Sequence, residues 1–137
     1  MAAMTDAQTE FLDQNPYVGT VTTLRGDGSP HSTIVWVDVR DRTVGFNTAH
    51  GRTKVRNLKR DPRVSLLVVD PSDPYKWVAV SGHAELTDDG ADDQIDKLAN
   101  KYIGEDVYPW RRPDERRVSV WIDVERVDSS GFEESGG

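Results

Sequence analysis

A chain of 137 residues with 36% hydrophobic residues and no cysteine is long enough for one domain, and it excludes disulfides, thiolate chemistry and cysteine-ligated metals. The formal net charge of -7 argues against general nucleic-acid binding, which needs a dominant positive surface. No apolar run approaches the ~20 residues of a membrane helix and no signal peptide is visible, so we expect no membrane span and a cytoplasmic location.

The first third of the chain predicts one short helix followed by strands. Thr5-Asp6-Ala7-Gln8 has the spacing of a capping box, and Asn15-Pro16 ends the helix. The Asp-Gly content of residues 25–29 indicates a hairpin turn. The segments around it are rich in Thr and Val, as strands are. We therefore expect strands at residues 17–24, 31–39 and 43–48.

The middle of the chain predicts a basic helix and two more strands. The helix begins at Arg52, and Asp61-Pro62 ends it. Residues 64–69 are continuously apolar, which is typical of a strand buried on both faces. A loop at 71–74 then leads to a strand at 77–86, in which Gly82 indicates a β-bulge.

The last third predicts a second helix and a final strand. The helix begins near Asp88 or Asp89, and Gly104 is placed to end it. Its apolar stripe consists of Ile95, Leu98, Ala99 and Tyr102. Residues 105–115 are irregular, 118–127 alternate as a strand, and 128–137 form a polar tail. Six short strands with few helices predict a mainly β fold, an antiparallel barrel in a single domain over 1–137 with an ordered core at 5–127.

The basic helix is the strongest functional signal. Residues 52–63 hold six cationic side chains and one acid, although the whole chain is acidic. A glycine turn at Gly51 precedes the helix, whose N-terminus offers free N–H groups and a positive dipole to an anion. Cations at this end oppose the dipole, so Arg52 and Lys54 make sense if a phosphate binds there.

These motifs resemble a known family. Asp27-Gly28-Ser29-Pro30, the strand Phe46-Asn47-Thr48, and Arg52-x-Lys54-x-x-Asn57-Leu58-x-x-Asp61-Pro62 occur in the order found in the pyridoxamine 5'-phosphate oxidase superfamily. The resemblance implies a six-stranded antiparallel split β-barrel with flanking helices, the FMN-binding-like fold. The chain is similar in particular to the small actinobacterial flavin/deazaflavin oxidoreductases that use coenzyme F420. It lacks the C-terminal motif for pyridoxal phosphate, so oxidation of pyridoxamine phosphate is not expected.

The resemblance also implies site residues. Arg52 and Lys54 would hold the cofactor phosphate, the second strand would lie under the ring, and Tyr75 and Trp77 would lie near the tail or substrate pocket. The expected cofactor-binding residues are His31, Ile34, Trp36, Phe46, Asn47, Thr48, Arg52, Thr53, Lys54, Arg56, Asn57, Tyr75 and Trp77. No catalytic residue is assigned, because the cofactor carries hydride chemistry.

The function implied is a reductase that transfers a hydride from reduced coenzyme F420 to an electron-poor acceptor such as an enone, quinone or tetrapyrrole. Two alternatives stay open: an FMN-dependent reductase or oxidase, and a non-catalytic protein that binds F420 or flavin. The family forms homodimers with two cofactors at the subunit interface, and the lean hydrophobic content agrees with a shared core.

Structural roles compete with several of these assignments. Arg56 and Asn57 suit capping or pairing within the helix, and His31 suits a strand histidine as well as a ring contact. Trp36 and Trp77 suit core packing, and Trp121 suits core or dimer packing. The three histidines lie on separate elements without ligand spacing, so no metal site is expected. The loop with Trp110, Arg111 and Arg112 is a candidate lid for a partner's pocket.

Overall fold

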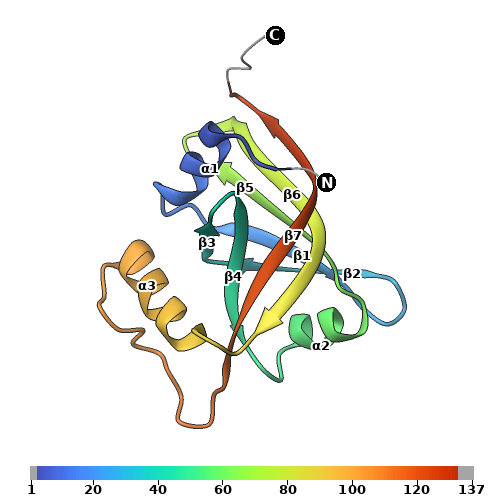
Figure 1. Cartoon of the computed structure of the whole chain (residues 1–137), viewed down its shortest axis with the longest axis vertical. Coiled ribbons are helices and arrows are strands. Elements are labelled where there is room, and N and C mark those ends of the chain that lie inside the picture. The colour runs from blue at the N-terminus through green and yellow to red at the C-terminus, as the bar shows by residue number, and fades with distance from the viewer. Residues whose placement is uncertain (1–2, 133–137) are drawn as a thin grey trace.

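A curled antiparallel sheet dominates the computed structural model, which describes residues 3–132 (Figure 1). Within that range three helices and seven strands form. They are α1 (Asp6–Asp13), β1 (Gly19–Leu24), β2 (Pro30–Val35), β3 (Val37–Arg40), β4 (Thr43–Ala49), α2 (Thr53–Arg60), β5 (Arg63–Asp70), β6 (Asp73–Thr87), α3 (Ala91–Ile103) and β7 (Arg117–Ser130). No helix in this range is both long and apolar enough to span a bilayer.

The sheet is split between two strands that are consecutive in the chain. Its strand order is β2-β1-β5-β6-β7-β4-β3, so β2 and β3 form the two edges. Only Trp36 separates these edges along the chain. The prediction of one strand over residues 31–39 is therefore wrong, and the sheet has seven strands where six were expected. The barrel itself, open along one seam, agrees with the predicted fold class.

Helix α3 covers the seam and satisfies its free backbone groups. The amide of Val37, at the start of β3, donates to the hydroxyl of Tyr102 at 2.9 Å. Its carbonyl accepts from the ammonium of Lys101 at 2.9 Å. Unpaired strand edges need such partners when they are covered. At the break at Trp36, hydrogen bonds to α3 therefore take the place of hydrogen bonds to a neighbouring strand.

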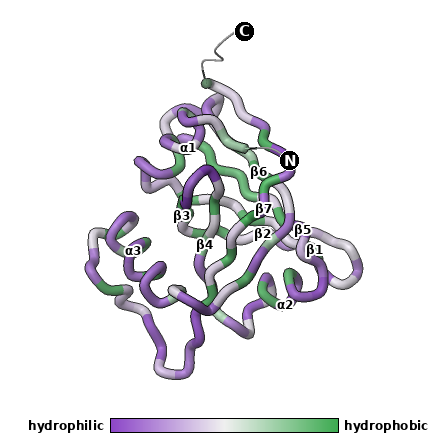
Figure 2. The backbone as a smooth tube through the Cα atoms, viewed as in Figure 1, coloured by the Kyte–Doolittle hydropathy of each residue, from purple (hydrophilic) through white to green (hydrophobic). Residues whose placement is uncertain are grey.

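Burial alternates along most strands, with one face toward the core. On β5, Val64, Leu66 and Val68 are buried, whereas Ser65 and Leu67 are exposed. The prediction that residues 64–69 are buried on both faces is therefore wrong for this chain. Figure 2 shows hydrophobic stretches along the strands at the centre and hydrophilic stretches on α2, α3 and the loop after α3.

Helix ends and irregularities follow the local sequence closely. Both bonds of the capping box at Thr5 and Gln8 are present, and Gly104 ends α3 in the left-handed conformation with φ 71°. The register between β5 and β6 is continuous past Gly82 and shifts between Val69 and Asp70, whereas that between β6 and β7 shifts at Gly82, which confirms the bulge. A Cβ at Gly82 would lie 1.9 Å from the Asp123 carbonyl oxygen, so no other residue fits there.

Two boundaries differ from the predictions. Strand β6 begins at Asp73, so the loop expected at 71–74 is a tight turn. Strand β7 continues through Ser130, because residues 128–130 pair with the start of β6. Phe132 then packs edge-on against Phe11 with ring centroids 5.2 Å apart. The expected polar tail thus does not begin at 128, and residues 133–137 lie outside the described part of the chain.

Candidate functional site

A cleft opens at the seam, between the N-terminus of α2, the ends of β2 and β4, and α3 with the loop that follows it. Its volume is about 140 Å³. The residues that line it are Ile34, Val35, Trp36, Asn47, Thr48, Arg52, Lys54, Ile95, Leu98, Tyr108, Trp110 and Arg117. The seam, the helix N-terminus and three cationic side chains therefore meet in one place.

Lys54 lies in the first turn of α2 and is only 7% exposed. Within residues 3–132 its ammonium has no hydrogen bond or ion pair. Burial lowers the pKa of Lys54, and the neighbouring charges of Arg52 and Arg117 lower it further. An unpaired cation held among other cations is unfavourable unless an anion joins it. The geometry around Lys54 therefore fits an anionic ligand.

The first turn of α2 adds backbone donors to the same place. Arg52 is the N-cap residue, and no side chain caps the helix. The amides of Thr53 and Lys54 have no acceptor among the described residues. The Arg52 guanidinium lies 3.9 Å from a carboxylate oxygen of Glu115, a loose contact that leaves its fork available. Free amides at a helix N-terminus beside two cations form a phosphate-binding arrangement.

Arg117, which the sequence did not indicate, is the third cation. Its Nε donates to Asn47 Oδ1 at 2.8 Å, and its Nη1 donates to Glu115 Oε1 at 2.6 Å. The guanidinium carbon also lies 5.2 Å from the centre of the Tyr108 ring. Arg117 is the first residue of β7, on the face opposite Val118, and lies one position before the strand expected at 118–127. That face is covered by α3, a packing that strand periodicity does not reveal.

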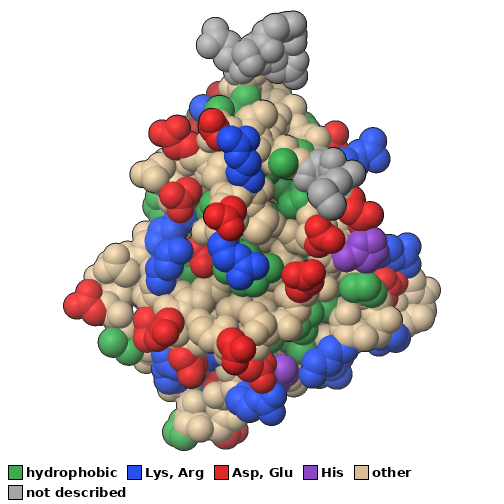
Figure 3. Space-filling model, viewed as in Figure 1, with side chains coloured by type: hydrophobic (Ala, Val, Ile, Leu, Met, Phe, Trp, Pro, Cys, Tyr) green, Lys and Arg blue, Asp and Glu red, His purple; other side chains and the backbone are tan. Residues whose placement is uncertain are grey.

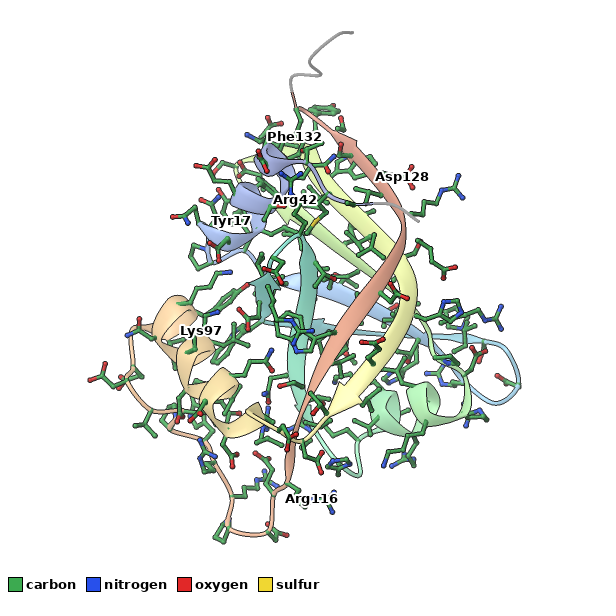
Figure 4. All side chains as sticks on the ribbon, in the orientation of Figure 1. Tyr17, Arg42, Lys97, Arg116, Asp128 and Phe132 are labelled. Carbon is green, nitrogen blue, oxygen red and sulfur yellow. The ribbon has the colours of Figure 1, made fainter. Side chains whose placement is uncertain are left out.

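A buried hydrogen-bond network positions Arg117. Asn47 Nδ2 donates to the Ala91 carbonyl at 2.8 Å and to Gln94 Oε1 at 2.9 Å. Gln94 in turn donates to Asp38 at 3.2 Å, and Asp38 accepts from Lys97 at 2.7 Å. The chain of polar side chains runs from the exposed Lys97 on α3, labelled in Figure 4, into the cleft. Such a satisfied network holds its members in one geometry.

Thr48 contributes a buried hydroxyl at the floor of the cleft. The Thr48 side-chain oxygen is inaccessible to solvent and has no hydrogen-bond partner. Buried polar atoms without partners are rare in folded proteins and point to a missing ligand or water. Thr48, Lys54 and the amides of the first turn all offer donors to one site. These residues therefore fit a cofactor that carries a phosphate.

An aromatic cluster forms the opposite side of the cleft. The ring of Trp36 stacks on that of Tyr102 at 5.4 Å and 8°. Tyr108 and Trp110, from the loop after α3, contact Trp36 at ring-centroid distances of 6.1 and 6.3 Å. The loop is held in place because Arg111 pairs with Asp92 at 2.7 Å and with Asp96 at 2.9 Å. The loop with Trp110 thus lines the cleft of its own chain.

A second polar cluster joins the turn before α2 to the start of β7. His50 Nε2 lies 2.6 Å from Asp88 Oδ1, and Arg116 donates to the other Asp88 oxygen at 2.9 Å. The hydrogen bond from His50 is the main cause that lowers the pKa of Asp88, and Arg116 adds to it. Lys59 lies 3.4 Å from His50 Nδ1. Arg116, labelled in Figure 4, thus engages Asp88 outside the cleft.

The structure brings six of the expected residues together in the cleft: Ile34, Trp36, Asn47, Thr48, Arg52 and Lys54. Thr53 follows Arg52 in the same turn, and its hydroxyl accepts from Arg56 at 3.2 Å. The cleft also contains Val35, Ile95, Leu98, Tyr108, Trp110 and Arg117, which had not been assigned to the cofactor. Four of these six come from α3 and its loop, because the position of α3 over the seam is a tertiary feature.

Other expected residues lie elsewhere. Phe46 is fully buried in the core, so its side chain cannot reach a ligand in the cleft. Arg56 donates to the Gly51 carbonyl. Asn57 donates to Thr23 at 3.0 Å and accepts from Arg60 at 2.9 Å. Both helix residues thus have the structural roles that the sequence had left open.

Three further residues are also outside the cleft. His31 lies on β2 opposite Thr23 and does not line it. Tyr75 and Trp77 lie near the start of β6, where Trp77 pairs with Ser130 at the far end of the sheet from α2 (Figure 1). Within a single chain these residues cannot join the cleft. Trp121 is buried, with Arg40 stacked 4.1 Å above its ring, on the outer face of β7.

The charge around the cleft is local. Figure 3 shows basic and acidic side chains interspersed over the viewed face, without a broad region of either sign. Within residues 3–132 no group of three or more His, Asp or Glu side chains is placed to hold a metal ion. The cations of the cleft therefore suit a small anion better than an extended polyanion.

Comparison with known proteins identifies relatives of the whole chain. The family model described as pyridoxamine 5'-phosphate oxidase matches residues 4–131. An F420H(2)-dependent biliverdin reductase of Mycobacterium tuberculosis is 29% identical over 126 residues, which cover 90% of this chain and 86% of that protein. A solved F420 reductase is 28% identical with a TM-score of 0.75, covering 87% of this chain and 94% of that one. A pyridoxamine 5'-phosphate oxidase-like protein of Listeria innocua, 21% identical over 90% of this chain and 95% of that one with a TM-score of 0.69, shares the fold.

Proposed function

The chain belongs to the pyridoxamine 5'-phosphate oxidase family, and from this premise we propose that it is an oxidoreductase that uses reduced coenzyme F420 to reduce an electron-poor organic acceptor. The observation that carries the proposal is the buried ammonium of Lys54, unpaired within the described residues and flanked by Arg52 and Arg117. The likeness to an F420H(2)-dependent biliverdin reductase and to an F420 reductase supports the choice of deazaflavin over FMN.

The residues of the cleft would divide the binding of such a cofactor between them. Arg52, Lys54 and the amides of the first turn of α2 would hold its phosphate, and the hydroxyl of Thr48 would donate a further hydrogen bond. Trp36 and Ile34 would offer apolar surface to its ring. Arg117 would add positive charge from beneath, held in place by Asn47 and Glu115.

Bound in reduced form, F420 supplies a hydride to a conjugated acceptor such as an enone, a quinone or a tetrapyrrole. The chain's own residues would bind and orient the reactants, and no Asp, Glu or His side chain lines the cleft. Orientation at near-contact distance lowers the barrier of a bimolecular step by several kcal/mol. The proton that completes the reduction would come from solvent or from the surroundings of the cofactor.

We also propose that the active form is a homodimer with the cleft at the subunit interface. The outer face of the sheet holds a row of uncharged side chains across four paired strands: Ile34, Thr20, Leu67 and Ala79. The next row along the strands consists of Ser32, Thr22, Ser65 and Ser81. An uncharged face with exposed Ile34 and Leu67 is suited to a partner. Because Ile34 also lines the cleft, a second copy on this face would border the cofactor site.

The decisive experiment is a pair of titrations of the apoprotein, one with F420 and one with FMN, followed by turnover assays. We expect tighter binding of F420, and oxidation of F420H2 in the presence of a suitable enone, quinone or tetrapyrrole. Tighter binding of FMN would assign the protein to the flavin users of the fold. Binding of F420 without turnover of any acceptor would indicate a cofactor carrier, and binding of neither would overturn the proposal.

A further inference from the structure

The cleft has a buried polar floor and an exposed apolar rim. Thr48, Lys54 and Arg117 at the floor are 1%, 7% and 6% exposed. At the rim, Ile34 and Trp110 are 62% and 60% exposed. Both sets line the same cleft. A ligand whose anionic group occupies the floor must enter first, and the part of the rim formed by Trp110 is then left for a second molecule.

The rim is built from aromatic rings that are fixed in place. Trp110 and Tyr108 meet edge to face, with ring centroids 5.7 Å apart and an interplanar angle of 86°. The Tyr108 amide donates to Asp96 of α3 at 2.9 Å, and Arg111 binds two acids on the same helix. Trp36 is held from behind by the stacked ring of Tyr102. Rigid rings lose little conformational entropy when a flat molecule stacks on them.

The exposed Trp110 needs a function beyond the packing of its own loop. The same loop exposes Val107 to an equal extent, 60%, yet Val107 does not line the cleft. Trp110 contacts Trp36 and Tyr108, lines the cleft together with them, and still leaves most of its surface exposed. A large aromatic surface at the mouth of a cationic cleft is typical of a ligand-binding wall.

We propose that Trp110, with Tyr108, forms the acceptor subsite beside the cofactor ring and selects a flat, conjugated acceptor several rings wide. This rests on the proposed function, because it assigns the second reactant of that reduction. An extended conjugated molecule gains stacking area along the rim in proportion to its width, whereas a single-ring acceptor gains little. Trp110 is thus a specificity residue for the acceptor and contributes little to the binding of the cofactor.

The experiment measures binding without turnover, so its outcome does not depend on catalysis. The protein is saturated with oxidised F420, or with FMN if FMN is the cofactor it binds, and biliverdin is titrated in by equilibrium dialysis. Trp110→Ala should raise the Kd for biliverdin roughly five- to tenfold. Trp110→Phe should stay within about twofold of the wild type because it retains a ring, and Val107→Ala, the matched control, should be unchanged.

Further outcomes separate this proposal from the proposed function. A Kd for the cofactor that is unchanged in Trp110→Ala supports the acceptor subsite. If Trp110→Ala weakens cofactor binding and leaves biliverdin binding unchanged, the proposal is overturned, because Trp110 then contacts the cofactor. The proposal is also overturned if the wild type does not bind biliverdin. It is overturned as well if Trp110→Ala raises the Kd for a single-ring quinone as much as it raises the Kd for biliverdin. Absence of turnover with reduced F420 bears on the proposed function alone.

Discussion

The ring of Tyr102 lies parallel to the indole of Trp36, at the point where β2 ends and β3 begins. Its hydroxyl donates to the Tyr17 carbonyl at 2.7 Å and accepts from the Val37 amide at 2.9 Å. One side chain of α3 therefore contacts both sides of the split in the sheet. The same helix carries Gln94, which organises the polar floor of the cleft. Closing the seam and shaping the site are functions of a single helix.

Removing the Tyr102 hydroxyl should destabilise the fold. Tyr102→Phe keeps the stacked ring but leaves the Val37 amide and the Tyr17 carbonyl without their partner. Buried groups left unpaired cost about 1–3 kcal/mol. We expect a loss of that size in the free energy of unfolding, measured by urea denaturation at pH 7. Tyr75→Phe, a change at a 77% exposed tyrosine, is the control and should have no measurable effect.

The same residue predicts an alkaline transition. Burial raises the pKa of Tyr102 to about 12 from its ordinary value of 10.0. Because the pKa is higher in the folded state, the protonated Tyr102 adds its full contribution to the free energy of unfolding below pH 10. That contribution is lost as the pH rises from 10 toward 12. The wild type should therefore lose stability in that range more steeply than Tyr102→Phe. Equal slopes for the two proteins in urea titrations at these pH values would contradict the assignment.

Lys54→Met should separate stability from binding. The ammonium is unpaired in the absence of a ligand, so the methionine variant should melt roughly 2–6 °C higher as apoprotein. It should bind a phosphate-bearing cofactor roughly ten- to a hundredfold more weakly, since a charge-assisted hydrogen bond contributes about 1.5–3 kcal/mol. Differential scanning fluorimetry and cofactor titration measure the two effects. Lys59→Ala, outside the cleft, should leave affinity unchanged.

The pH dependence of that stability difference has a defined sign. The pKa of Lys54 is lowered in the folded protein, chiefly by burial. The folded state therefore binds the Lys54 proton less tightly than the unfolded state does. Below the folded-state pKa, the charged ammonium lowers the free energy of unfolding by its full amount. The advantage of Lys54→Met should shrink as the pH rises toward the ordinary lysine value of 10.5. If Lys54→Met is more stable than the wild type by the same amount up to pH 10.5, the charge of Lys54 is not the cause of the difference.

Arg117→Met should be strongly destabilising, because it leaves Asn47 and the carboxylate of Glu115 without their partner. The Arg117 and Glu115 side chains are 4% and 10% exposed, and breaking a buried pair costs about 3–5 kcal/mol. The double variant Arg117→Met/Glu115→Gln should recover part of the loss. A double-mutant cycle by urea denaturation measures the coupling, and strict additivity would mean that the pair contributes nothing.

Leu67→Glu should test the proposed dimer interface. Leu67 is 41% exposed on the uncharged outer face, so a carboxylate there does not disturb the core of a single chain. In a dimer it would be buried without a partner. We expect light scattering to give twice the mass of 15.3 kDa for the wild type and a shift to monomer for the variant. A wild type that is monomeric at micromolar concentration would exclude the interface.

Local signals predicted most of the fold and about half of the site. The capping box at Thr5, the bulge at Gly82 and the cap at Gly104 depend on a few neighbouring residues, and all three were found. The break at Trp36 was not predicted, because it is stabilised by Lys101 and Tyr102, which lie more than sixty residues away. Arg117 was missed because it lies one position before the expected strand at 118–127 and because α3, a distant element, covers its face of β7.

The seam at Trp36 also has a consequence for folding. The strands at the two ends of the sheet order are joined by a single residue, so the loop that brings them together is as short as a chain allows. The entropy lost in closing a loop grows with its length, and here that cost is small. The costly closure is the pairing of β4 with β7, in which Gly45 pairs with Trp121, 76 positions further along the chain. We expect mutations along β4 and β7 to slow folding. Mutations at the seam should instead speed unfolding if, as we expect, α3 docks there after the strands have paired.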